Sequence, residues 1–451
     1  MELAELPQWE MAVYWFLSFS SHIFSFYQLH RFSKAEHEKS LDREVHLEKG
    51  FLVWGYKKDP TDFEWSFWNE WVWRSLFCSL IGHTVVSRLC GVYLPQCRKA
   101  VLTLYGMVSA WWLLGFKGVA VLMLHLSVSL VVAQLHSPTL SWGCAILLLS
   151  TLHISSLQDV QRAWYDSEER YLLLLFSTAV CALRCISFSL ELCWSPLLAG
   201  GPSVRCPFVQ FRRMKELATQ LSSLTSYCFY HPLFYNGPVI TYKDFSQQIE
   251  RPVCNVSAQW LLAKLLRVCV WWCLAEFMIH VMYMHAIQNN ETYLHILSPW
   301  ALDTLMWDST NGSLGGSHHG PFQKVISTAL AFGFVCFWHG FHDYLQYWAL
   351  LNWLGVLVEN IIAVFLTSPP LHRIIVCYLS PRMQRRGLAL VSAFSTAMII
   401  LSNLVFLGGT HVGHVYWKRV FVQGWSTMAV PMLAFLYCFA QVGLEVDRKQ
   451  S

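Results

Sequence analysis

The stretch Val325–Leu345, VISTALAFGFVCFWHGFHDYL, is followed after one residue by Tyr347–Leu366, YWALLNWLGVLVENIIAVFL. Each consists almost entirely of apolar and aromatic residues. Each also has about the 20 residues that a helix needs to cross a hydrocarbon core about 30 Å thick. The two stretches therefore predict adjacent membrane-spanning helices, and they contain the polar side chains on which a functional interpretation depends.

The composition of the whole chain agrees with a membrane environment. Of its 451 residues, 55% are hydrophobic and only 13% are charged, whereas soluble domains average about 25% charged residues. The mean hydropathy is +0.38. So few charged groups cannot cover a water-facing surface, which excludes an ordinary soluble protein. The net charge of +4 is too small to indicate nucleic-acid binding.

Further apolar runs follow one another along the chain with short polar gaps. The candidate spans are Met11–Leu29, Trp71–Leu94, Val101–Gly115, Gly118–Gln134, Leu140–Leu157, Tyr171–Leu198, Trp260–Ile287, Val325–Leu345, Tyr347–Leu366, Leu388–Leu407 and Val420–Val442. The pair between Val101 and Gln134 reads as two short spans or as one span with a re-entrant piece. A second re-entrant element is predicted at Tyr230–Ile240, between prolines. We predict an all-α polytopic membrane protein of about ten transmembrane helices, forming a single domain over residues 1–451.

Polar side chains are costly in hydrocarbon and usually face an interior cavity. The sharpest case is His339, in Phe337-Trp338-His339-Gly340. One interpretation is a histidine hydrogen-bonded to a neighbouring helix. The other is a general base in a sealed central tunnel, because a neutral imidazole accepts a proton near neutral pH. Acyl transfer from a thioester needs such a base and one or two donors for the oxyanion, without a metal.

Two further polar residues lie in predicted spans. Asn403 could donate a hydrogen bond to a carbonyl, or it could bond to another helix. Glu359 could accept a hydrogen bond from a substrate amine, or it could face a loop or pair with a cation. The residue types alone leave these alternatives open.

No metal site is predicted. None of the CxxC or histidine-pair spacings typical of zinc sites is complete, although the chain has 15 cysteines. Most cysteines lie in apolar runs, Cys181 and Cys185 among them, and are interpreted as reduced, small apolar side chains. His280 and His285 are five residues apart, whereas metal-binding pairs on a helix favour a spacing of three or four.

Several stretches together resemble the membrane-bound O-acyltransferase family. They include Phe337-Trp338-His339-Gly340, Leu351-Asn-Trp-Leu-Gly-Val-Leu-Val-Glu359-Asn360, Asn236-Gly-Pro238 and Ile400-Leu-Ser-Asn403-Leu-Val-Phe-Leu-Gly-Gly409. The match is strongest with members that acylate hedgehog signalling proteins. The resemblance implies transfer of palmitate from palmitoyl-CoA to the amino-terminal cysteine of a hedgehog protein as an amide. It also implies a multi-pass protein of the endoplasmic reticulum membrane, with the Golgi as an alternative.

The resemblance also assigns roles to the site residues. His339 matches the catalytic histidine of the family, and Asn403 matches a position that contacts the acyl donor. Trp338 and Glu359, in the same motifs, are predicted to help to bind acyl-CoA or the acceptor. The partners implied are a hedgehog precursor and membrane lipid.

One family motif is missing. Between Trp300 and Gly315 the chain lacks several dozen family residues, including an aspartate associated with the chemistry and a cysteine associated with haem. The chain then resembles an isoform with impaired activity. Two alternatives remain: an O-acyltransferase that acts on a lipid or another peptide hydroxyl, and a non-catalytic membrane scaffold.

Overall fold

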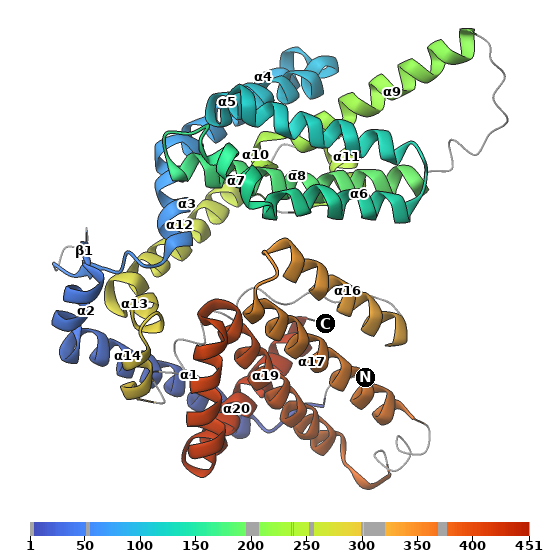
Figure 1. Ribbon diagram of the computed structural model, residues 1–451. Coiled ribbons are helices and arrows are strands. Elements are labelled where there is room, and N and C mark those ends of the chain that lie inside the picture. The colour runs from blue at the N-terminus through green and yellow to red at the C-terminus, as the bar shows by residue number, and fades with distance from the viewer. Residues whose placement is uncertain are drawn as a thin grey trace. The chain divides into compact units, whose positions relative to one another are not determined.

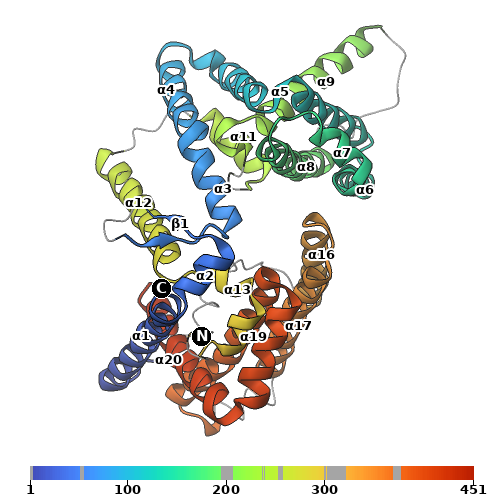
Figure 2. The same ribbon diagram turned by 60° about the vertical axis from the view of Figure 1, so that its left-hand side comes forward.

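The computed structural model describes residues 4–50, 55–194, 207–235, 237, 239–251, 257–298, 301, 321–368 and 377–450. Within these residues the chain is helical apart from two strands of two residues each, β1 (Glu48–Lys49) and β2 (Lys57–Lys58), which pair antiparallel. The chain divides into two compact units, residues 64–262 and residues 1–63 with 263–451. Figures 1 and 2 show the helices of each.

The unit of residues 64–262 is built around one enclosed helix. Its elements are α3 (Phe63–Trp71), η2 (Val72–Leu76), α4 (Phe77–Tyr93), η3 (Pro95–Cys97), α5 (Arg98–Ala133), α6 (Pro138–Ser150), η4 (Thr151–His153), α7 (Ser155–Arg162), α8 (Glu168–Trp194), α9 (Pro207–Cys228), α10 (His231–Phe234) and α11 (Tyr242–Glu250). Helix α8 packs against α5, α6 and α9, and 72% of its apolar stretch is buried. Leucines such as Leu122, Leu126 and Leu174 fill the space between these helices. Helix α8 is therefore the interior helix of this unit.

The second unit contains both the amino-terminal and the carboxyl-terminal parts of the chain. Its elements are α1 (Gln8–His30), η1 (Arg31–Glu36), α2 (Glu38–Val45), the two strands, most of α12 (Ala258–Val281), α13 (Met284–Gln288), α14 (Glu291–Ile296), α16 (Pro321–Trp338), α17 (Asp343–Thr367), α19 (Pro381–Tyr416), η7 (Trp417–Gln423), η8 (Trp425–Ala429) and α20 (Val430–Gln450). Helix α19 packs against α17 and α20, α16 packs against α17, and α1 packs against α20 (Figure 2). This unit contains all four predicted site residues.

Two arginines of this unit pair with carboxylates, as charged side chains inside membrane proteins usually do. Arg385 of α19 is 2% exposed and donates to the Glu445 carboxylate of α20 at 3.0 Å. The same guanidinium donates to the Ala4 carbonyl at 2.8 Å. Arg386 donates to Glu10 of α1 at 2.7 Å. These bonds join the amino-terminal helix to α19 and α20.

The prediction of a polytopic, all-helical membrane protein is confirmed. Among the described residues, five helices are long and apolar enough to cross a membrane, and six if the bent pair Pro138–His153 and Ser155–Arg162 is one span. The predicted spans Val101–Gly115 and Gly118–Gln134 correspond to the two helical arms of α5, which meet at a kink where the backbone of Gly115 is not helical (φ +69°). Helices α1, α12 and α17 form where other spans were predicted.

Candidate active site

The position of His339 is set by the end of α16. The backbone N–H of Gly340 donates to the Phe337 carbonyl at 3.1 Å, and that of Phe341 donates to the Cys336 carbonyl at 2.9 Å. This pair of bonds is the Schellman arrangement, which needs a residue with positive φ directly after the helix. Gly340 supplies it with φ +102°. The His-Gly sequence thus fixes the imidazole at the carboxyl end of the helix.

Two aromatic rings meet the imidazole edge to face. The Trp338 ring centroid lies 4.6 Å from that of His339, and the Phe406 centroid, from α19, lies 5.6 Å away. Asn403 precedes Phe406 by three residues, so both lie on one side of α19. Asn403 is buried, at 6% exposed. The structure therefore brings Trp338, His339 and the Asn403 side of α19 together.

Helices α17 and α19 are held in register by polar and aromatic contacts. Trp348 packs on Phe406 with ring centroids 5.0 Å apart. One turn further along α17, the Ser402 hydroxyl donates to the side-chain oxygen of Asn352 at 3.3 Å. The pairing runs antiparallel, since higher numbers on α17 meet lower numbers on α19. Sequence reasoning did not identify Trp348 and Phe406, because only the fold brings them to His339.

Glu359 lies apart from this group. It is exposed, and it accepts a hydrogen bond from the Ser395 hydroxyl of α19. Sixteen residues of α17 separate it from Asp343, a rise of about 24 Å at 1.5 Å per residue. Its predicted role in binding substrate stays a prediction, and any such contact would be far from the reacting atoms at His339.

A hydrogen-bond donor beside His339 and the exposure of its side chain suit the binding of an acyl carbonyl group. The Trp338 indole N–H is buried and has no hydrogen-bond partner within the described ranges. A buried N–H without a partner is rare and often marks a place where a ligand supplies the acceptor. The His339 side chain itself is exposed. The carboxyl end of α16 favours the imidazolium that forms when the base takes up a proton.

No metal ligands surround His339 in the part of the chain that the structure describes. Groups of three or more ligating side chains occur there at Cys181, Cys185 and Cys228 and at Glu291, His295 and His411. Neither group includes His280 or His285. Residues 302–320, which include most of the junction between Trp300 and Gly315, lie outside the described residues.

Replacing Gly340 with alanine is expected to destabilise the protein by about 1–2 kcal/mol, because a side chain strains a residue with positive φ. The control is Gly333→Ala in the interior of α16, where an added Cβ meets nothing within 4 Å. That change should stabilise the helix by about 0.5–1 kcal/mol. Unfolding midpoints in detergent should shift in opposite directions. Equal shifts of the unfolding midpoint in the two variants would contradict the positive φ of Gly340 at the end of α16.

Comparison with known proteins places this site in a family. The sequence model of MBOAT, the membrane-bound O-acyltransferase family, matches residues 312–407, a range that includes all four predicted site residues. The mouse protein-cysteine N-palmitoyltransferase HHAT is 38% identical, over 97% of this chain and 98% of that protein. The mouse HHAT-like protein is 22% identical (88% and 87% covered), and Drosophila melanogaster protein-cysteine N-palmitoyltransferase Rasp is 21% identical (73% and 76% covered).

The alignment with mouse HHAT also gives the number of positions at which this chain has no residue. It extends over 500 positions, whereas 97% of 451 residues is about 437, so about 63 positions of the alignment have no residue in this chain. This number fits the several dozen residues that the sequence comparison finds missing before Gly315. The similarity nevertheless runs through nearly the whole of both proteins, and the chain therefore belongs to the membrane-bound O-acyltransferase family.

Proposed function

We propose that this chain is a protein-cysteine N-palmitoyltransferase that transfers palmitate from palmitoyl-CoA to the amino-terminal cysteine of a hedgehog protein. The observation that carries the proposal is the 38% identity with a palmitoyltransferase over 97% of the chain. The grouping of His339, Trp338 and Asn403 supports it. Both compact units belong to one acyltransferase of roughly ten transmembrane helices in the endoplasmic reticulum membrane, with His339 in a tunnel that excludes water.

The chemistry follows from the groups at the end of α16. The amine nitrogen of the acceptor attacks the thioester carbonyl, so a C–N bond forms as the C–S bond breaks. His339 accepts the proton that the amine loses and returns it to the departing thiolate of CoA. The Trp338 indole N–H donates to the oxyanion of the tetrahedral intermediate, where a fixed donor stabilises the transition state most. Asn403 orients the acyl donor from α19.

The direct test uses the purified chain in detergent, palmitoyl-CoA with a labelled acyl chain, and a peptide with the amino-terminal sequence of a hedgehog protein. We expect label on the peptide that survives hydroxylamine, because an amide resists it and a thioester or oxygen ester is more readily cleaved. A matched peptide with an acetylated amino terminus should remain unlabelled. Label that hydroxylamine removes would point to a hydroxyl or thiol acceptor instead. A complete absence of transfer, also with the missing segment restored, would refute the proposal.

Asn403→Leu is expected to weaken binding of the acyl donor because it removes a buried amide of similar size. Loss of a hydrogen bond of this kind corresponds to about 1–3 kcal/mol, or a rise of roughly 5- to 150-fold in KM for palmitoyl-CoA. The KM for the acceptor peptide should change little. The control is Asn360→Leu on α17, whose amide donates to the Val356 carbonyl of its own helix. An equal rise in the KM for palmitoyl-CoA in both variants would contradict a specific role of Asn403 in binding the acyl donor.

A further inference from the structure

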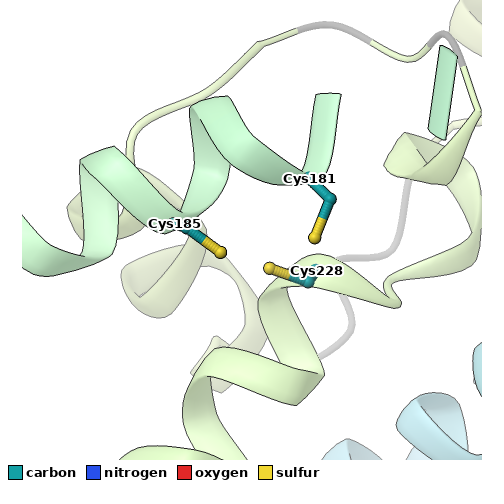
Figure 3. A group of neighbouring side chains, drawn as sticks. All are labelled: Cys181, Cys185 and Cys228. Carbon is teal, nitrogen blue, oxygen red and sulfur yellow. The ribbon is translucent and has the colours of Figure 1, made fainter. Parts of the chain in front are cut away.

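Three buried cysteines form a cluster in the unit of residues 64–262. Cys181 and Cys185 are one helical turn apart on α8, and Cys228 is the last residue of α9. Their three sulfur atoms lie within 4.8 Å of one another, and none of the three takes part in a disulfide. Figure 3 shows the three side chains pointing toward a common centre. All three are at most 2% exposed.

A buried positive charge lies beside the cluster. Arg184, between the two cysteines of α8, is 2% exposed and donates through Nη1 to the Cys228 carbonyl at 2.8 Å. Its guanidinium also lies 5.9 Å from the centroid of the Tyr227 ring. Within the described ranges it forms no ion pair, and its Nη2 has no hydrogen-bond partner. Because a guanidinium stays charged, burial without an anion costs several kcal/mol.

The thiols can supply this anion only when they are deprotonated, and a bound metal ion deprotonates them. We propose that Cys181, Cys185 and Cys228 bind a zinc ion that joins α8 to α9. Binding exchanges three S–H bonds for three Zn–S bonds and releases three protons to water. Three thiolates and Zn²⁺ carry a net charge of −1, which the +1 charge of Arg184 neutralises. With Cu⁺ the same ligands would carry −2 and leave an uncompensated charge in the interior.

The geometry fits a metal bound by three sulfurs. A Zn–S bond of about 2.3 Å places three ligands in a trigonal plane about 4.0 Å apart, within the limit of 4.8 Å observed. His125 of α5 is a candidate fourth ligand. Its side chain is 5% exposed and its Nδ1 has no hydrogen-bond partner within the described ranges, although its ring nitrogens are not among the ligand atoms that lie within 4.8 Å of one another. Thiolates and imidazole are the ligand types of structural zinc sites.

The test measures zinc in the full-length chain purified in detergent without chelator. Mass spectrometry of the metal should give about one zinc per chain, as expected for a single structural site. Zinc should be nearly absent from Cys181→Ser, Cys185→Ser and Cys228→Ser. The control is Cys90→Ser, a buried cysteine on α4 outside the cluster, which should keep its zinc. Zinc content equal in all four variants would overturn the proposal, as would absence of zinc from a wild-type chain incubated with excess Zn²⁺.

A second measurement uses the wild-type chain, so it does not depend on whether the cysteine variants fold. Exchanging the metal of the wild-type chain for Co²⁺ should produce an intense thiolate-to-cobalt absorption band in the near ultraviolet. Arg184→Met keeps the three thiols and removes the balancing charge, so zinc retention against a competing chelator should fall at least about tenfold, equivalent to about 1.4 kcal/mol. A wild-type chain without the cobalt band, or unchanged zinc retention in Arg184→Met, would refute the charge-balanced site.

Discussion

His339→Ala is expected to lower the rate of palmitoyl transfer about 10²- to 10⁴-fold, the usual contribution of a positioned general base. The loss should appear in kcat rather than in KM, because the imidazole acts on the proton of the acceptor and not on the acyl chain. Transfer of label from palmitoyl-CoA to the hedgehog peptide measures it. Because the His339 side chain is exposed, free imidazole in the buffer should restore part of the activity of His339→Ala.

His342→Ala is the matched control. His342 is also exposed and lies three residues further along the chain, where its ring stacks on Tyr344 with centroids 5.7 Å apart. Within the described residues, its ring does not pack on Trp338 or Phe406, the two rings that meet His339. Its replacement should leave kcat within about twofold, as surface changes away from a site usually do. Equal losses in both variants, or full activity of His339→Ala, would exclude His339 as the base.

The fold class could be predicted because composition alone determines it. Apolar runs of about 20 residues must become helices in a membrane, where each backbone N–H needs a partner within its own segment. The joining of helices was less predictable. Gly115 and Gly409 each take a positive φ inside a long helix, and a glycine in a sequence shows only that such a kink is allowed. In α5 the kink at Gly115 lies at the boundary between the two predicted segments, and the sequence did not decide whether these are two spans or one span with a re-entrant piece.

The candidate site was predictable to the extent that it is local in sequence. His339 and Gly340 are adjacent, so the pattern contains both the base and the residue that ends its helix. Phe406 and Asn403 reach the imidazole only through the packing of α17 against α19, which a single sequence does not show. The same limit explains why the sequence alone did not predict the cysteine cluster. Cys181 and Cys185 share a helical face, but Cys228 joins them only through the contact between α8 and α9.

Restoring the missing segment is expected to raise kcat/KM for palmitoyl transfer by about 10²-fold or more, the effect of supplying a lost oriented group in a closed site. Water around an exposed base also competes for its hydrogen bond with the substrate and lowers the rate, whereas a closed site excludes this water. The change inserts the corresponding residues of mouse HHAT between Trp300 and Gly315.

Two matched insertions separate closure from chemistry. A glycine-serine segment of equal length in the same place should give no gain, because it neither packs nor carries donors. The mouse segment with the aspartate that the family resemblance implies changed to asparagine should recover closure without the carboxylate, and therefore only part of the rate. All three proteins are compared by transfer of labelled palmitate to the hedgehog peptide at equal amounts of monodisperse protein. If the mouse segment gives no more activity than the glycine-serine segment, this junction does not limit the reaction, and the exposed His339 already stands in its working environment.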